Sequence, residues 1–314
     1  MLNKQKHAGL TMVELLVAMA ISLLITLAAV AALVVARRGF DTVDSASQLR
    51  DNMRFSADLI QRLGAQTGYK EPQYLPGTLS APGTNANISG FNNSTIVSIT
   101  DINTINTAVR TDAGGGDILI LRMQGNADGS VINCSGSPAN TTNVAEDRSV
   151  SIIHVAESQG ELALMCSTFD TNKFVLPISA QPIIQGVENF QVLYGTDGVT
   201  PNAAPTLAQD SVPDQFLRAD QLVVAGDAVA TQNNWRRVRS LRIGMVLRGP
   251  PNSQQEKVAQ VFYPFGLAKA SASGVVGGAL SSGSDAGTLF NAPADGRLRQ
   301  TMTFTVHLRN DQSL

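Results

Sequence analysis

The longest apolar run of the chain lies near its N-terminus, at residues 15–36. These 22 residues carry no charge, and only Ser22 and Thr26 among them are polar. An α-helix of this length rises by about 33 Å, which is close to the thickness of the hydrocarbon core of a bilayer. The run contains no Pro or Gly that would kink the helix. It therefore predicts a membrane-spanning helix, whose orientation stays open because two Lys precede the run and two Arg follow it.

Beyond the apolar run, the pattern becomes amphipathic. From residue 40 to residue 63, apolar residues recur at the three- and four-residue spacings of an α-helix. They are Phe40, Val43, Met53, Phe55, Ala57, Leu59, Ile60 and Leu63. Residues 37–64 are therefore predicted to continue the first helix, and Gly64 to end it. A helix over residues 10–63 would be about 80 Å long, with residues 10–36 in lipid and the rest on a globular head.

The remaining sequence divides into a loop-rich connector at residues 65–116 and a β-rich head at residues 117–314. Pro, Gly and Asn interrupt the connector, in which only "STIVSIT" has the composition of a strand. The head contains segments with strand patterns, namely "DILILRMQ", "SVSIIHVA", "ELALMC", "VENFQVLYG", "WRRVRSLRIGMVLRG" and "QTMTFTVHLRN". A Gly/Ala/Ser-rich stretch near residues 265–297 is predicted to be a flexible loop. The expected fold class is α+β, a long helix packed on a mainly antiparallel sheet.

Composition narrows the classes of partner and compartment. The formal net charge is -2 and the pI about 5.9, so the chain has no general attraction for nucleic acid. Cys134 and Cys166, the two cysteines, both follow the apolar run. If this part of the chain is exported, a disulfide between them is expected, and two free thiols are the alternative.

No catalytic or cofactor-binding motif is evident in the sequence. It lacks the serine-hydrolase, zinc-protease and phosphate-loop signatures and any His/carboxylate cluster at metal-ligand spacing. His7 lies in the basic N-terminal segment, while His154 and His307 lie on predicted strands, where a solvent-facing or hydrogen-bonded histidine is the commoner case. The chain is therefore predicted not to be an enzyme and to hold no metal or cofactor.

Several arginines accompany the only Trp of the chain. Arg236, Arg237 and Arg239 would form a basic strip for DNA or an anionic surface polymer if their side chains were free. The alternative is a strand with solvated arginines on one face and Trp235 at its edge. The overall charge of the chain favours this alternative, so nucleic acid is not an expected partner.

One carboxylate, Glu14, lies at the start of the apolar run, where a charge is costly. A cleaved secretory signal peptide would have a shorter apolar segment and no use for this acid. Thr11 and Glu14 also match a capping box, in which each side chain accepts a hydrogen bond from the backbone N–H of the other residue. A capping box does not explain the abrupt Gly9-Leu10 junction after a short basic segment. The third interpretation is cleavage after Gly9, which makes Leu10 the first residue and Glu14 the fifth.

The segment "AGLTMVELLVAMAISLL" resembles the signature of type IV prepilins, with a basic leader, a Gly, an apolar residue and a Glu before an apolar helix. The resemblance implies that prepilin peptidase removes residues 1–9 and that the new α-amine of Leu10 is N-methylated. Leu10 stands where Phe is commoner in the family. Glu14 would then act in assembly, because it is unpaired in the bilayer and pairs in the filament with the α-ammonium of Leu10 or of its equivalent on a neighbouring subunit.

Blocks in the head resemble PilW-type minor pilins of the type IV pilus. In order, they are "DILILRMQG", Cys134, "GELALMC", "QPIIQGVENFQVLYGTD", the W-x-x-V-R-x-L-R-I pattern and "TFTVHLRN". The resemblance implies a structural minor pilin, held in the inner membrane with its head in the periplasm and later part of the pilus at the cell surface.

The implied partners are prepilin peptidase, other minor pilins, the major pilin and a large tip adhesin. Together they would form an initiating tip complex that supports adhesion and twitching motility. Two rival functions remain open: a minor pseudopilin of a type II secretion system, and a binding module displayed on the filament as an adhesin or DNA receptor.

Overall fold

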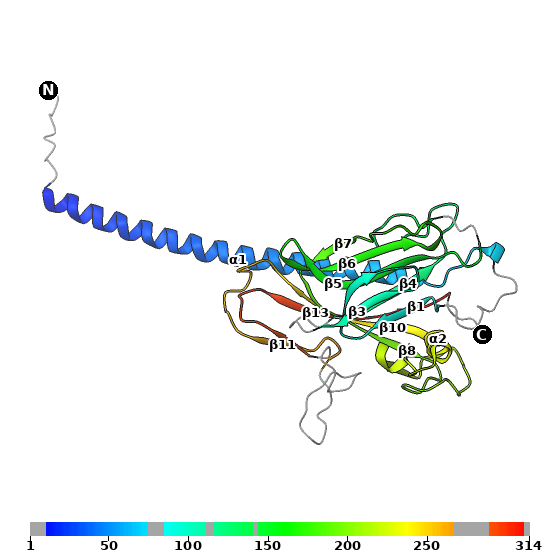
Figure 1. The fold of residues 1–314 in the computed structure, drawn as a ribbon. Helices are drawn as coiled ribbons and strands as arrows, with labels where there is room; N and C mark the ends of the chain where they lie inside the picture. Colours follow the sequence, from blue (N-terminus) through cyan, green and yellow to red (C-terminus); the bar gives the residue numbers. More distant parts are fainter. Residues whose placement is uncertain (1–10, 75–84, 111–115, 141–143, 267–288, 311–314) are drawn as a thin grey trace, which may run out of the picture.

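The computed structural model describes residues 11–74, 85–110, 116–140, 144–266 and 289–310. Its first element is α1, Met12–Gln66, a single helix of 55 residues whose N-terminal half projects away from the head (Figure 1). The head is built mainly from two antiparallel sheets. The predicted α+β fold class, a long helix with antiparallel sheets, is therefore confirmed.

The first sheet has five strands in the order β1-β4-β5-β6-β7. Their bounds are Ile88–Phe91, Ile118–Met123, Ser149–Ser158, Glu161–Asp170 and Ala180–Gln185. The second sheet has the order β13-β10-β8-β9, with bounds Arg299–His307, Val238–Arg248, Val187–Thr196 and Gln215–Leu217. The chain crosses from the first sheet to the second at Gly186, directly between β7 and β8.

Smaller elements complete the head. Two two-stranded pairs are formed by β2 and β3, Ser94–Ile99 and Ile105–Val109, and by β11 and β12, Gln260–Phe262 and Phe290–Ala292. A short helix, α2, spans Ala228–Trp235, and single 3₁₀ turns occur at Pro72–Tyr74, Thr171–Lys173 and Ala219–Leu222.

The main hydrophobic core joins the second half of α1 to both sheets. The apolar positions of β10 predicted to share one face, Leu241, Ile243, Met245 and Leu247, are all fully buried. Each pairs across the sheet with β13, where Met302, Phe304 and Val306 face the same core. The alternation in these two segments therefore predicted the correct face.

The second half of α1 lies on this core through Leu49, Ile60 and Leu63. Gly64 lies inside the helix, two residues before its end, so it does not stop the helix as expected. A Cβ at Gly64 would collide with the side chain of Val306 on β13. Glycine at this position therefore allows the helix and the sheet to approach closely.

The β2–β3 hairpin covers the outer face of the first sheet. Ile96, Ile99 and Ile105 of the hairpin pack on a second buried cluster that includes Ile118 and Ile152. Strands β4 and β5 are therefore buried on both faces over most of their length, which explains why the sequence of β4 is a nearly continuous apolar run. The connector at residues 65–116 thus contributes three strands, β1, β2 and β3, where the sequence predicted one.

Part of the segment near residues 265–297, expected to be a flexible loop, is a strand. Phe290 and Ala292 of β12 are buried and pack with Val246 of β10. Both residues are buried because they pack on the far side of the second sheet. The Gly/Ala/Ser composition of the segment gives no sign of this contact. Residues 267–288 of the predicted loop lie outside the described residues.

The structure joins Cys134 and Cys166 in a disulfide, with 5.7 Å between their Cα atoms. Cys166 lies on β6, and the backbone N–H of Cys134 donates to the hydroxyl of Ser151 on β5 at 3.0 Å. Both cysteines are buried in the main core. The bond therefore ties the segment after β4 to the middle of the first sheet.

Candidate functional site

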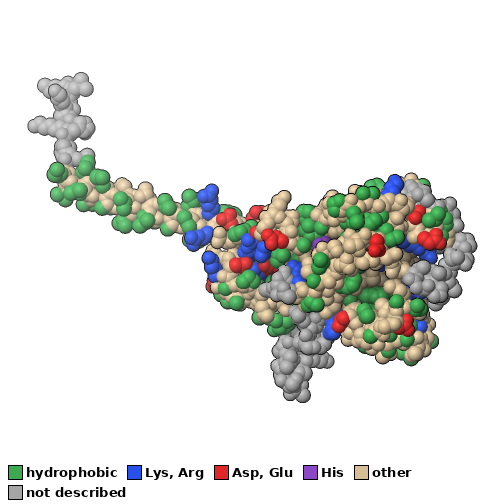
Figure 2. Space-filling model, in the orientation of Figure 1, with side chains coloured by type: hydrophobic (Ala, Val, Ile, Leu, Met, Phe, Trp, Pro, Cys, Tyr) green, Lys and Arg blue, Asp and Glu red, His purple; other side chains and the backbone are tan. Residues whose placement is uncertain are grey.

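The N-terminal half of α1 has no cover from its own chain. Its large apolar side chains from Met12 to Val35 are between 42% and 86% exposed. Figure 2 shows this half as an apolar rod that extends from the head, with Lys and Arg side chains where the rod meets the head. It is the one helix of the described chain that is long and apolar enough to cross a membrane. So much exposed apolar surface requires lipid or other apolar helices around it.

Glu14 lies at the tip of this rod and has a local partner. The hydroxyl of Thr11 accepts a hydrogen bond from the backbone N–H of Glu14 at 3.3 Å. The carboxylate of Glu14 accepts one bond from the backbone N–H of Thr11 and one from its hydroxyl, both at 3.0 Å. The capping box is therefore formed in the single chain. Gly9 and Leu10, the predicted cleavage and methylation positions, lie outside the described residues.

The second half of α1 presents an outward face that the sequence stripe did not predict. Phe40, Val43 and Phe55 are 75%, 67% and 53% exposed, although all three were expected on the core side. Leu49, which the predicted stripe omitted, is buried instead. The helical phase was misjudged because apolar residues occur on both faces of this half. The exposed surface of α1 therefore continues beyond the apolar rod along the head.

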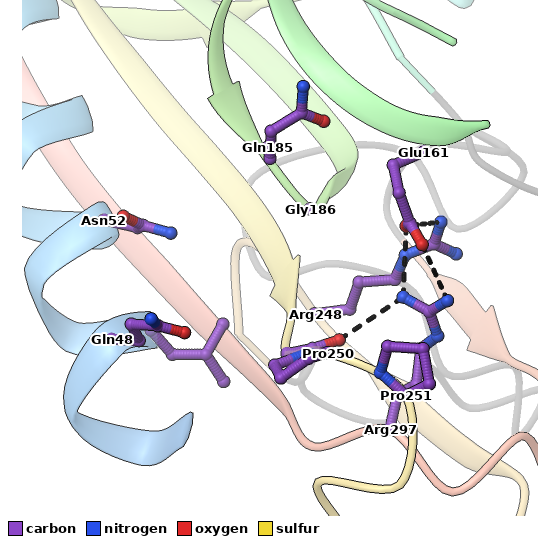
Figure 3. Close-up of a pocket in the computed structure, with 11 residues that line it drawn as sticks. Gln48, Asn52, Glu161, Gln185, Gly186, Arg248, Pro250, Pro251 and Arg297 are labelled. Atoms are coloured by element: carbon purple, nitrogen blue, oxygen red, sulfur yellow. Dashed lines mark hydrogen bonds and ion pairs between the residues drawn. The ribbon is translucent and has the colours of Figure 1, made fainter. Parts of the chain in front are cut away.

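A pocket of about 250 Å³ lies beside this face, where α1 meets the two sheets (Figure 3). Gln48, Leu49 and Asn52 of α1 form one wall, with Gln185 and Gly186 at the sheet crossing. Opposite them lie Glu161, Arg248, Arg297 and the segment from Gly249 to Pro251.

An ion-pair network closes the inner side of the pocket. Arg297 donates two hydrogen bonds to the Glu161 carboxylate, at 2.8 Å and 3.0 Å, and Arg248 donates a third at 2.5 Å. The hydrogen bonds from Arg297, with those from Arg248, hold the pKa of Glu161 below its usual range. Arg248 also pairs with the buried Glu188 at 2.9 Å. The charges that border the pocket therefore neutralise one another.

The arginines of the predicted surface strip are engaged within the head. Arg239 is buried and pairs with the buried Asp197 at 3.4 Å. Arg237 donates to the carbonyl oxygens of Gly198 and Leu207, and Arg236 to the side-chain oxygen of Asn233. The contacts of Arg237 and Arg239 hold the loop after β8. The three side chains therefore do not form a free basic strip. The reason is tertiary, because the acceptors are up to 42 residues away in sequence.

His154, expected to be solvent-facing or hydrogen-bonded, is buried on β5, and neither ring nitrogen has a hydrogen-bond partner within the described chain. Burial lowers the pKa of His154 to about 4, although the backbone of Val155 opposes the shift in part. The guanidinium of Arg110 adds to the lowering. The ring is therefore neutral in the folded protein near neutral pH. His307 is exposed on β13, and His7 lies outside the described residues.

Replacing His154 with leucine is expected to reduce the loss of unfolding free energy between about pH 7 and about pH 4.5. The folded ring binds a proton only near pH 4, whereas the unfolded ring binds one near pH 6.5. Because the unfolded chain binds more protons between these values, the free energy of unfolding falls as the pH falls, by about 2–3 kcal/mol from this group. Urea unfolding of the full chain in detergent, at about pH 7 and about pH 4.5, measures this difference. His307→Leu is the matched control, and an unchanged pH dependence in His154→Leu would contradict the expectation.

Among the described residues, no group of three or more His, Cys, Asp or Glu could hold a metal ion. The features that stand out are the exposed rod, the capped Glu14, the outward face of α1 and the pocket beside it. All four belong to α1 or border it. The exposed rod and the outward face leave much of α1 without cover from the described chain.

Two models of known protein families match the chain. The family model for the prokaryotic N-terminal methylation motif matches residues 4–30, and the model for type IV pilus-assembly protein W matches residues 153–310. No curated protein sequence matches the chain. A type IV-like pilin from Thermus thermophilus aligns with 83% of this chain over 96% of its own length, at 15% identity and a TM-score of 0.36. Because the assembly-protein model covers half of the chain and the methylation motif precedes it, the chain belongs to the PilW family of type IV pilus-assembly proteins.

Proposed function

We propose that the chain is a structural minor pilin, inserted into the type IV pilus after prepilin peptidase cuts between Gly9 and Leu10. The leader stays at the cytoplasmic face, Leu10 is N-methylated, and the head lies in the periplasm until assembly. Other minor pilins, the major pilin and a large tip adhesin are its proposed partners. In a tip complex, it would support adhesion and twitching motility.

The observation that carries this proposal is the exposed rod with a carboxylate at its tip. Lipid covers the rod before assembly, and helices of other pilins cover it afterwards, so transfer between the two keeps the apolar surface away from water. The carboxylate gains from the transfer, because a charge at the centre of the bilayer costs about 2.5–3.5 kcal/mol and Thr11 offers Glu14 only uncharged hydrogen-bond donors. In the filament, the α-ammonium of Leu10 or of a neighbouring subunit supplies that partner.

The rival functions receive less support. A minor pseudopilin of a type II secretion system shares the rod, but the matching family model describes pilus assembly. An adhesin or DNA receptor based on the arginine strip is disfavoured because Arg239 is buried and Arg237 is bonded to backbone carbonyls. A structural role in the pilus is the function that fits these observations best.

Mass spectrometry of the mature N-terminus tests the proposal. In cells with prepilin peptidase, the N-terminal peptide is expected to begin with a methylated Leu10. In cells without the peptidase, the leader is expected to remain, and sheared pili should lack the chain. An intact leader in both strains, or a cut after residue 36, would overturn the proposal.

A further inference from the structure

The pocket beside α1 contains three side-chain amides that its own chain leaves unused. Gln48 and Asn52 project from successive turns of α1, and Gln185 ends β7 on the opposite side (Figure 3). None of the three side chains makes a hydrogen bond within the described chain. Each amide offers both a donor and an acceptor. Such groups match the N–H and C=O of a polypeptide backbone.

The charges around the pocket select against a charged occupant. Glu161 is saturated by Arg248 and Arg297, and the second partner of Arg248 is Glu188. Arg248 keeps one buried donor, Nε, for which the described chain has no acceptor. An uncharged acceptor such as a backbone carbonyl would satisfy it. The rings of Pro250 and Pro251 add apolar surface for a small side chain.

The sheet beside the pocket is open for an added strand. β7 is the outermost strand of the first sheet, and no strand of the described chain pairs with its outer edge. Its residues Ala180, Gln181 and Pro182 are exposed and uncharged. Pro182 has no backbone N–H to donate, so strand addition by an extended segment that begins in the pocket at Gln185 is limited to the end of β7 after Pro182.

The neighbouring surface indicates where such a segment comes from. Gln48 and Asn52 lie at the border of the outward face of α1, where Phe55 is exposed. A pilin helix packed along that face brings its own subunit next to the pocket. We propose that the pocket and the edge of β7 bind an uncharged, extended segment of a neighbouring pilin subunit. This inference rests on the proposed function, since it requires the chain to be part of a filament.

Site-specific crosslinking in assembled pili tests the inference. A photoreactive amino acid replaces Gln185 in the full chain, and the same amino acid replaces Val97, which is exposed on the β2–β3 hairpin, as control. After illumination, the Gln185 position is expected to yield an adduct with another pilin, at a peptide free of charged residues. An adduct with a polysaccharide or a non-pilin protein, or the same peptide from the Val97 position, would overturn the inference.

An isosteric charge change supplies a second readout. Gln185→Glu places a carboxylate where the occupant would exclude water, and is expected to reduce incorporation into pili about tenfold. Gln255→Glu, at an exposed glutamine that does not line the pocket, is expected to leave incorporation unchanged. Normal incorporation of Gln185→Glu would overturn this inference and leave the proposed function standing. If the wild-type chain were absent from pili, the proposed function would fail, and this inference with it.

Discussion

Replacing Glu14 with glutamine is expected to reduce incorporation into the pilus by roughly a hundredfold. The charged side chain is costly in lipid and paired in the filament, so its neutral isostere loses the driving force for transfer between them. The cost of a charge at the centre of a bilayer, about 2.5–3.5 kcal/mol, is the upper bound on this driving force and corresponds to roughly a hundredfold change in equilibrium. The ratio of chain in sheared pili to chain in membranes, measured for the wild type and for Glu14→Gln, tests this expectation.

Thr11 provides the control that separates assembly from helix capping. Thr11→Val removes the hydroxyl that bonds with Glu14 but keeps the carboxylate. Loss of such a cap costs about 1 kcal/mol of helix stability and should change incorporation only slightly. Equal defects in Thr11→Val and Glu14→Gln would indicate that Glu14 acts as a cap. Normal incorporation of Glu14→Gln would end the pairing hypothesis.

Removing the disulfide is expected to lower the free energy of unfolding of the head by about 3–4 kcal/mol. The bond closes a loop with a sequence separation of 32, and the constraint it places on the unfolded chain has this magnitude. Alanine at both Cys134 and Cys166 avoids a polar hydroxyl in the buried core around them. Urea unfolding of the full chain in detergent, with and without a reductant, measures the change.

The reductant is the internal control for this measurement. It should destabilise the wild-type chain by a similar amount and leave the double alanine variant unaffected. Two alkylatable thiols in wild-type chain purified from the periplasmic side of the membrane would show that the bond is absent in cells. Equal stability of the wild-type and double-variant chains would show that the bond contributes little.

The long helix was predictable because its signals are local. An unbroken apolar run, a T-x-x-E pattern and a Gly-Leu junction lie within a few turns of one another, and no distant contact competes with them. The core-facing residues of β10 and β13 were predictable for the same reason, since apolar residues recur at every second position in each strand. The cysteine pairing was predictable because the sequence has two cysteines and the head is expected to be exported.

Other features depended on partners distant in sequence. β1 and β3 have irregular patterns, and they form strands because β4 and β2 pair with them. Gly64 was expected to end the helix, but its role is set by Val306, which lies at the other end of the chain. The sequence made Arg239 a candidate surface residue. In the structure, the loop after β8 brings Asp197 against it, and both side chains are buried.

Glu14 illustrates both kinds of evidence. The sequence by itself determined that an acid stands at the head of a spanning helix, five residues into the predicted mature chain. The structure added that Thr11 donates hydrogen bonds to this carboxylate in the single chain. Assembly would therefore exchange an uncharged local partner of Glu14 for a charged one on the filament.

The sequence by itself therefore determined the spanning helix, the motif at its start, the alternation of the main strands and the family. Each of these is specified by neighbouring residues, whose spacing sets which face they occupy. Only the tertiary structure decided the phase of the second half of α1, the engagement of the arginines, the burial of His154 and the pocket at Gln48, Asn52 and Gln185. These depend on contacts between segments far apart in the chain, and local spacing carries no information about which distant side chains meet.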